Sequence, residues 1–264
     1  MYNYSQDEYY WKIQSQMTYE NLPKLKNKSN ESSWKTFYLS NRLSRYLVIG
    51  SEIDEMKIID IKERLQNRGL LNVDHYNVYG FLSLPDDNFL HRYDAIFFFS
   101  YCGFKQISIG NQLSHFVDSG GGVVVCAYTT GCGRGNRLEG RWLEGGYSPF
   151  LDGVTQRISQ LKIGTKHNQS HPILSNLNDQ HFTGGQHSSH SDAIPSETAL
   201  KICDWSNGKT LIAEIHKPNA KIIGLNFYPP EIVASNDKSN SDIILYNALK
   251  YVSNFNKNKE GETM

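Results

Sequence analysis

Short apolar runs alternate with amphipathic stretches over the first half of the chain. The run 95–99, AIFFF, is apolar at every position, which is typical of a central strand in a parallel sheet covered on both faces. Over 109–117 the apolar residues recur at i, i+4, i+7 and i+8, the spacing of one helix face. Three glycines at 120–122 end that helix, and a second apolar run follows at 123–126. This order predicts a right-handed strand–helix–strand unit.

The same alternation precedes this unit. An apolar strand is expected at 46–50, followed by a helix that places Ile58, Ile61 and Leu65 on one face, and by a second strand at 73–79. Strands that alternate with helices in this way indicate an α/β fold, with a doubly wound, mostly parallel sheet and helices on both faces.

The pattern changes after residue 130. Strands are expected at 156–162 and 198–204, and 209–228 has two strand-like runs around a Pro-Asn-Ala turn, which predicts a C-terminal β-hairpin. Apolar residues at helical spacing over 241–255 predict a closing helix.

Three regions are expected along the chain. Residues 1–43 lack a sustained apolar period but contain many aromatic residues, so an N-terminal extension that packs partly on the domain is predicted. A docking segment for another protein is the alternative. Residues 44–256 form the main domain, and residues 257–264 form a polar tail.

Composition narrows the function classes. The 264 residues include 27 Lys and Arg and 27 Asp and Glu, and a formal charge of zero points to neither nucleic acid nor an anionic membrane as a partner. No apolar run approaches the roughly 20 residues of a membrane span, and the first residues do not have the pattern of a secretory signal. The four cysteines form no CxxC pair, which favours reduced thiols in the cytoplasm. No cofactor is predicted, and the partner is an unknown small molecule or protein.

Candidate binding residues follow the apolar run at 123–126, where ligands collect beyond the carboxyl ends of parallel strands. Arg134, Arg137 and Arg141 could clamp a carboxylate, a phosphate or a sugar acid. Trp142 and Tyr147 could stack on a sugar ring. The alternatives are a solvated loop, with Arg141 paired to Glu139 or Glu144, and aromatic rings that hold the loop against the core.

A polar loop at 183–191 contains two histidines. His187 and His190, with Asp192, could supply imidazoles and a carboxylate to a metal ion or to Cys126. A solvent-exposed loop without a metal site is the favoured alternative.

Three stretches in the right order resemble a known superfamily. They are YDAI at 93–96 with FVDSGGGVV at 116–124, HPIL at 171–174, and KIIGLNFYPPE at 221–231. Over about residues 45 to 255 the chain resembles the class I glutamine amidotransferase-like superfamily, and within it the ThuA-like (trehalose-utilisation) branch. The resemblance implies a flavodoxin-like, Rossmann-like fold.

The resemblance also implies roles for particular residues. In active members a cysteine at a central strand end attacks an amide, a histidine on the closing strand takes its proton, and a glutamate orients the histidine. Cys126 and Glu231 match the cysteine and the glutamate, but Tyr228 stands at the histidine position, and a phenol with a pKa of about 10 is a poor general base near neutral pH. Tyr128 stands where the family has the glycine of a sharp bend. Cys126 could equally be a buried apolar residue that ends a strand.

Three functions are therefore considered. The favoured one is a catalytically degenerate domain, not an enzyme, that binds a small ligand or a protein at the carboxyl ends of the strands, where Tyr128 and Tyr228 are expected to be neighbours. The second is a cysteine-dependent hydrolase or amidotransferase that pairs Cys126 with His187 or His190. The third is a ThuA-like role in carbohydrate metabolism, with a sugar held by the loop at 141–147.

Overall fold

The computed structural model describes residues 44–130, 136–151, 153–157, 161–177, 189–232 and 240–253. All of them belong to one compact unit, Ser44–Lys259. The predicted N-terminal extension and polar tail lie outside the described residues, as do Arg134 and His187, and only the backbone of Glu231 is described.

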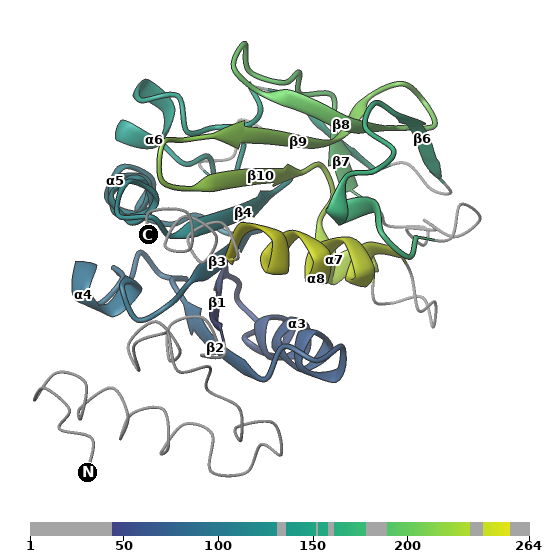
Figure 1. Cartoon of the computed structure of the whole chain (residues 1–264). Helices are drawn as coiled ribbons and strands as arrows, with labels where there is room; N and C mark the ends of the chain where they lie inside the picture. Colours follow the sequence, from purple (N-terminus) through teal and green to yellow (C-terminus); the bar gives the residue numbers. More distant parts are fainter. Residues whose placement is uncertain are drawn as a thin grey trace, which may run out of the picture. The chain divides into compact units, whose positions relative to one another are not determined.

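One eight-stranded sheet forms the centre of the domain (Figure 1), in the order β2-β1-β3-β4-β10-β9-β8-β6. Its parallel part comprises β2 (Asn72–Asn77), β1 (Arg45–Ser51), β3 (Ala95–Ser100), β4 (Gly122–Cys126) and β10 (Lys221–Leu225). An antiparallel extension follows, with β9 (Thr210–His216), β8 (Leu200–Trp205) and β6 (Ile163–Lys166). The strands β5 (Thr155–Arg157) and β7 (Ser189–Ser191) pair separately.

Helices cover both faces of the sheet, as the alternation of strands and helices predicts. The helices α3 (Met56–Asn67) and α8 (Asn240–Ser253) pack on one face, while α4 (Asp87–Leu90), α5 (Gln106–Asp118) and α6 (Arg141–Glu144) pack on the other (Figure 1). Phe97 and Phe99 of β3 point into the first layer, and Ile96 and Phe98 point into the second. Every residue of β3 is buried, which explains why its sequence is apolar throughout.

The glycine run at 120–122 joins α5 to β4 through close packing. Gly120 has a φ of +104°, which ends α5 in a conformation that other residues rarely adopt. At Gly121 a side chain would collide with the Phe116 ring, and at Gly122 an added Cβ would lie 2.5 Å from Cβ of Val252 on α8. The run is therefore needed for packing as well as for the turn.

The second half agrees with the predicted hairpin and closing helix. β9 and β10 pair antiparallel, with Lys221 opposite His216 and Leu225 opposite Ile212, and α8 ends the described chain. Of the strand predicted over 156–162, the described residues contain the start in β5 (Thr155–Arg157), whereas residues 161 and 162 do not belong to a strand. Within the described part, no helix is long and apolar enough to cross a membrane.

Candidate functional site

Three tyrosines meet where the parallel strands end. Tyr101 follows β3, Tyr128 follows β4 and Tyr228 follows β10. The ring centroids lie 5.2 Å apart for Tyr128 and Tyr228, 5.7 Å for Tyr101 and Tyr128, and 5.9 Å for Tyr101 and Tyr228. Tyr128 and Tyr228 are buried, whereas Tyr101 is partly exposed. The two residues expected to be neighbours at this edge therefore do lie together, with a third ring beside them.

A buried glutamate completes this cluster. Glu52, directly after β1, is 1% exposed, and its Oε1 accepts a 2.6 Å hydrogen bond from the Tyr228 hydroxyl. Its Oε2 lies 3.5 Å from Nζ of Lys57. Burial raises the pKa of Glu52, although the contacts with Tyr228 and Lys57 oppose the rise. Sequence reasoning missed Glu52, and the available signal was an acidic residue directly after an apolar strand.

Asn77 fixes the backbone of Glu52. The Asn77 side-chain amide donates a 2.9 Å hydrogen bond to the Glu52 carbonyl, and its Oδ1 accepts from the Glu52 backbone N–H at 3.3 Å. The same Oδ1 accepts from the N–H of Tyr79 at 3.1 Å. One side chain therefore holds the ends of β1 and β2 together at the edge where Glu52 lies.

Cys126 lies inside the sheet, not at a bend. It is the last residue of β4, pairs in register with Leu225, and is fully buried within the core layer that includes α8. Burial, and then the charge of Glu52, raise the pKa of the Cys126 thiol well above its ordinary value. Because the thiolate is the nucleophilic form, this setting disfavours reaction.

The strained bend falls at Tyr128, two residues later. Its φ of +66° is unusual for an aromatic residue. Thr129 closes the bend, since its hydroxyl donates a 2.6 Å hydrogen bond to the Cys126 carbonyl. Strained backbone often lies at functional positions, and here it directs an aromatic ring, not the thiol, into the cluster.

The closing segment departs from the expected pattern as well. β10 ends at Leu225, and α7 (Pro229–Ile232) begins directly after Tyr228, so the Glu231 backbone lies on a short helix. Tyr228 is 1% exposed and packs on Phe99. The Tyr228 hydroxyl donates its proton to Glu52. The phenol therefore stands where a histidine base was expected, but its partner is a carboxyl group and not the Cys126 thiol.

His190 is buried, contrary to the exposed loop that was favoured. It lies on β7 with its ring 5.9 Å from Trp205. Lys209 N–H donates to Oδ1 of Asn207, which orients the amide so that its Nδ2 donates to Nε2 of His190 at 3.3 Å. The proton of the neutral ring is then on Nδ1, which has no hydrogen-bond partner among the described residues. Burial lowers the pKa of His190.

The described residues contain no group of three or more His, Cys, Asp and Glu side chains that could hold a metal ion. The hydrogen bond from Asn207 attaches His190 to the turn between β8 and β9. Its contact with Cys126 remains a prediction.

Comparisons with known proteins identify the fold of the chain. No family model and no curated protein matches the chain. A solved ThuA-like protein from Parabacteroides merdae superposes with a TM-score of 0.50 at 12% identity, over 80% of this chain and 90% of that one. The fold is ThuA-like. The predicted resemblance is confirmed at this level, and at this identity the match establishes the fold alone.

Two further structures are similar. The mmIFT52 N-terminal domain has a TM-score of 0.48 at 14% identity, over 78% of this chain and 97% of that one. The exo-β-1,4-mannosidase Op5Man5 from Opitutaceae bacterium strain TAV5 has a TM-score of 0.47 at 10% identity, over 79% of this chain and 36% of that one.

The amino ends of the parallel strands, opposite the tyrosine cluster, are where Arg141, Trp142 and Tyr147 lie. Arg141 pairs with Asp118, the last residue of α5, and Asp118 also accepts a 2.6 Å hydrogen bond from the Tyr147 hydroxyl. Since α5 joins two parallel strands, its last residue lies at their amino ends. Nζ of Lys217, on the turn that enters β10, is 4.1 Å from the centre of the Tyr147 ring.

These contacts place Trp142 and Tyr147 against the core, while a ligand at Arg141 remains a prediction. Trp142 is 1% exposed and stacks on Tyr147 with centroids 5.9 Å apart, so the two rings hold the loop against the core. Arg141 pairs with Asp118, not with the expected Glu139 or Glu144. The three residues do not share a site with Tyr128 and Tyr228.

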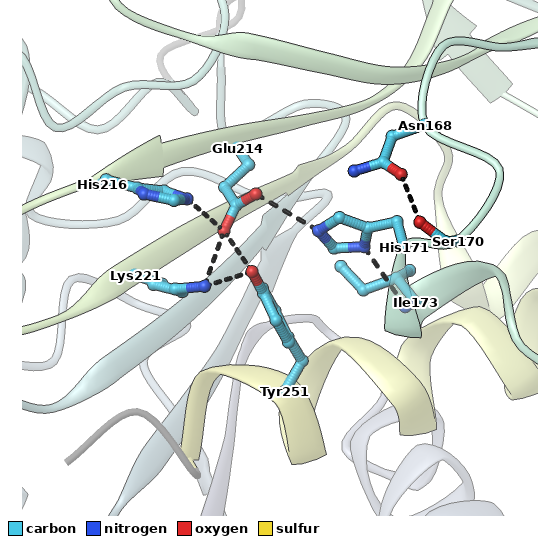
Figure 2. A network of polar contacts seen from close by, with 8 residues as sticks. All are labelled: Asn168, Ser170, His171, Ile173, Glu214, His216, Lys221 and Tyr251. Carbon is cyan, nitrogen blue, oxygen red and sulfur yellow. Dashed lines mark hydrogen bonds and ion pairs between the residues drawn. The ribbon is translucent and has the colours of Figure 1, made fainter. Parts of the chain in front are cut away.

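A second polar cluster centres on Glu214 of β9 (Figure 2). Its Oε1 accepts a 2.8 Å hydrogen bond from the Tyr251 hydroxyl and lies 2.7 Å from Nε2 of His216 and 3.5 Å from Nζ of Lys221. Its Oε2 lies 3.2 Å from Nε2 of His171. Four segments of the domain therefore converge on one buried carboxylate.

The protonation states in this cluster follow from its geometry. Nδ1 of His171 accepts from the backbone N–H of Ile173 at 3.3 Å (Figure 2), so the proton lies on Nε2 and is donated to Glu214. Burial alone would raise the pKa of Glu214, but the hydrogen bonds from His171 and Tyr251 and the charges of His216 and Lys221 lower it to about 2. Both oxygens are satisfied, and Lys221 begins β10. The cluster is therefore a structural connection at the amino edge, away from the strand ends where ligands collect.

Proposed function

We propose that this chain is a catalytically degenerate ThuA-like domain, which binds a small ligand or a protein at the carboxyl ends of its parallel strands. The observation that carries the proposal is the 2.6 Å hydrogen bond from Tyr228 to Glu52. A tyrosine at the expected place of the base, with its proton committed to a buried carboxyl group, is not available to activate a thiol.

The setting of Cys126 supports the same proposal. A nucleophilic cysteine needs a lowered pKa and access to solvent, whereas Cys126 is fully buried and its pKa is raised. The free cysteines Cys102, Cys126 and Cys203 also support the cytoplasmic location that we propose.

The surface at this edge is suited to binding. Lys57 is the charged member, with Nζ 5.6 Å from the centre of the Tyr101 ring, and both side chains are partly exposed. An incoming molecule would meet this ring and this ammonium group first. Aromatic faces favour a ligand with a flat or apolar part, and a negative group on the ligand would share Lys57 with Glu52, which lies 3.5 Å from its Nζ.

Two assays test the loss of catalysis. Purified full-length protein is incubated with glutamine and with p-nitrophenyl acetate, and iodoacetamide labelling is mapped to individual cysteines by mass spectrometry. We expect no turnover above background, and labelling of Cys126 slower than that of a free thiol. Turnover that disappears in Cys126→Ser would contradict the proposal.

A thermal-shift screen tests the binding role. Carboxylates, phosphates and sugars are tested with the wild type and with Lys57→Met. A ligand present at 100 times its dissociation constant stabilises the folded state by about 2.7 kcal/mol, so a shift in the wild type that is reduced in Lys57→Met supports binding at this edge. An equal shift in both proteins would place the ligand elsewhere.

A further inference from the structure

His190 is a buried histidine whose hydrogen bonds are incomplete. It lies on β7, is 2% exposed, and has its ring centroid 5.9 Å from that of Trp205. Its Nε2 is bonded to Asn207, whereas its Nδ1 has no partner among the described residues. A buried polar group without a partner costs free energy, and histidine is the side chain that most readily changes its charge near neutral pH. A single proton can therefore change the local structure at this position.

The partner of Nε2 is fixed in its orientation. Asn207 lies in the exposed turn 206–209, between β8 and β9. Its Oδ1 accepts a 3.1 Å hydrogen bond from the backbone N–H of Lys209. Its amide nitrogen, which can only donate, therefore faces His190 at 3.3 Å. This bond forms only when Nε2 carries no proton.

A second proton on the ring would oppose this arrangement. Protonation places an N–H on Nε2, where it would face the N–H groups of the Asn207 amide, and neither group can accept. Turning the amide over would present Oδ1 to the ring, but it would remove the acceptor of the Lys209 N–H. One of the two hydrogen bonds is lost in either case. The protonated ring is therefore incompatible with the closed turn.

The surroundings of His190 favour the neutral ring. Trp205 from β8 and Asn207 from the turn carry no charge. Among the described residues two charges act on the ring: Asp192 favours the protonated form, and Lys209 disfavours it. Burial has the largest effect and lowers the pKa of His190 below its ordinary value of 6.5. The ring is therefore neutral at pH 7 and gains its second proton only in acid.

The strand β7 has another attachment that does not involve His190. Oδ1 of Asn226, directly after β10, accepts a 2.7 Å hydrogen bond from the N–H of Ser191. The Asn226 amide nitrogen donates at 2.8 Å to the carbonyl groups of Ser191 and Thr210. None of these groups titrates near neutral pH. Loss of the bond from Asn207 would therefore leave β7 and the start of β9 in place, and would free only the turn 206–209.

We propose that His190 is an acid-sensitive latch: protonation of its ring breaks the hydrogen bond from Asn207 and releases the turn 206–209 from β7. The turn lies at the carboxyl edge, because the start of β9 pairs with the end of β10, and ligands collect at this edge in such sheets. Acid would therefore change the surface of the edge. The latch does not depend on the proposed loss of catalysis or on a ligand, so either proposal can stand without the other.

The first test reads the positions of the protons. Full-length protein labelled with nitrogen-15 at histidine is studied by long-range proton–nitrogen NMR, which distinguishes the two neutral tautomers. Spectra are recorded from about pH 8 to about pH 5, the range in which histidine titrates. We expect the neutral His190 ring to carry its proton on Nδ1 and to titrate with a pKa below 6.5. A neutral ring with its proton on Nε2 would overturn the proposal.

Backbone hydrogen exchange measures the release of the turn. The reporter is the N–H of Lys209, which Asn207 accepts, and the reference is the N–H of Ser191, which Asn226 accepts. After correction for the intrinsic effect of pH, exchange at Lys209 should rise in acid by up to about tenfold for each unit by which the pKa of His190 lies below 6.5. Ser191 should stay protected. Unchanged exchange at Lys209, or an equal rise at both amides, would contradict the latch.

Two variants separate the latch from a general effect of acid. Asn207→Asp provides a carboxylate that accepts from the protonated ring, so the pKa of His190 should rise by about one unit or more and the acid-induced exchange at Lys209 should disappear. His190→Gln removes the titrating group and should abolish the same response. His91→Gln, at an exposed histidine, is the control and should behave as the wild type.

The Asn207→Asp variant keeps the test decisive if His190→Gln fails to fold. Asn207 is exposed, so its substitution should leave the melting temperature at neutral pH close to that of the wild type. Acid-induced exchange at Lys209 that persists in folded Asn207→Asp would show that His190 does not control the turn, and the proposal would be abandoned.

Discussion

The hydroxyl of Tyr228 donates a 2.6 Å hydrogen bond to the carboxyl group of Glu52, across 176 positions of the sequence. Both side chains are almost fully buried. The bond links the end of β10 to the end of β1, on either side of β3 and β4. Tyr228, which stands at the histidine position that the family resemblance implied, therefore has its hydroxyl directed to a buried carboxyl group.

Tyr228→Phe should destabilise the domain by about 1 to 3 kcal/mol, because it removes one hydrogen-bond donor from the buried carboxyl group of Glu52. The pKa of Glu52 should rise further, since the lost hydrogen bond opposes the effect of burial. Urea unfolding measures the first effect, and a carbon-13 NMR titration of the glutamate carboxyl groups measures the second. Tyr79→Phe, at an exposed tyrosine, is the control, and equal stability of the two variants would refute the prediction.

Tyr228→His should not restore thiol chemistry. The imidazole would face Glu52, while Cys126 would stay in the strand with its raised pKa. We expect the rate at which iodoacetamide alkylates Cys126 to change by less than about threefold. A lowered thiol pKa would increase this rate by more than that. A large increase, or the appearance of glutamine hydrolysis, would show that the thiol is within reach of this position.

Glu214 should make the domain sensitive to acid. Its pKa falls from 4.5 to about 2 on folding, so its contribution is complete above pH 4.5 and is lost as the pH falls towards 2. A shift of this size corresponds to roughly 3 kcal/mol. In urea unfolding, Glu214→Gln should be less stable than the wild type at neutral pH and should lose less stability between about pH 5 and pH 2.5.

The control for this experiment is Glu63→Gln, which changes an exposed glutamate of α3. Its stability should follow the wild-type pH dependence. If Glu214→Gln also follows the wild type, the Glu214 carboxylate does not have the role that the network in Figure 2 indicates.

Gly121→Ala should cost about 1 to 3 kcal/mol, since the new methyl group meets the Phe116 ring. Phe116→Leu replaces that ring with a smaller side chain, and should therefore offset part of the lost stability in the double variant. A double-mutant cycle in urea measures the coupling between the two sites. Additive effects would mean that backbone strain, not the ring, sets the cost.

The sequence was sufficient for the elements whose apolar period is strong. The runs that became β3, α5 and β4 follow the spacing of buried strands and an amphipathic helix, and the order of motifs indicated the fold. Helical and strand periods are local properties, so they can be read without knowing the rest of the molecule.

The site residues depend on contacts that are not local. Nothing near Glu52 in the sequence signals Tyr228, and Arg141 has two acidic neighbours in sequence but pairs with Asp118. The strained backbone of Tyr128 arises from the turn after β4, which the sequence does not reveal because glycine, the usual signal, is absent there. Partner choice in such cases follows from the packed sheet, and becomes visible only in three dimensions.

The Glu214 network also constrains when the domain can mature during synthesis. Its donors extend from His171 to Tyr251, so a nascent chain cannot complete the network until α8 has left the ribosome. Until then a charged side chain of β9 lacks its hydroxyl partner. The antiparallel half of the sheet should therefore reach its final order late, after the amino-terminal strands and helices have already been made.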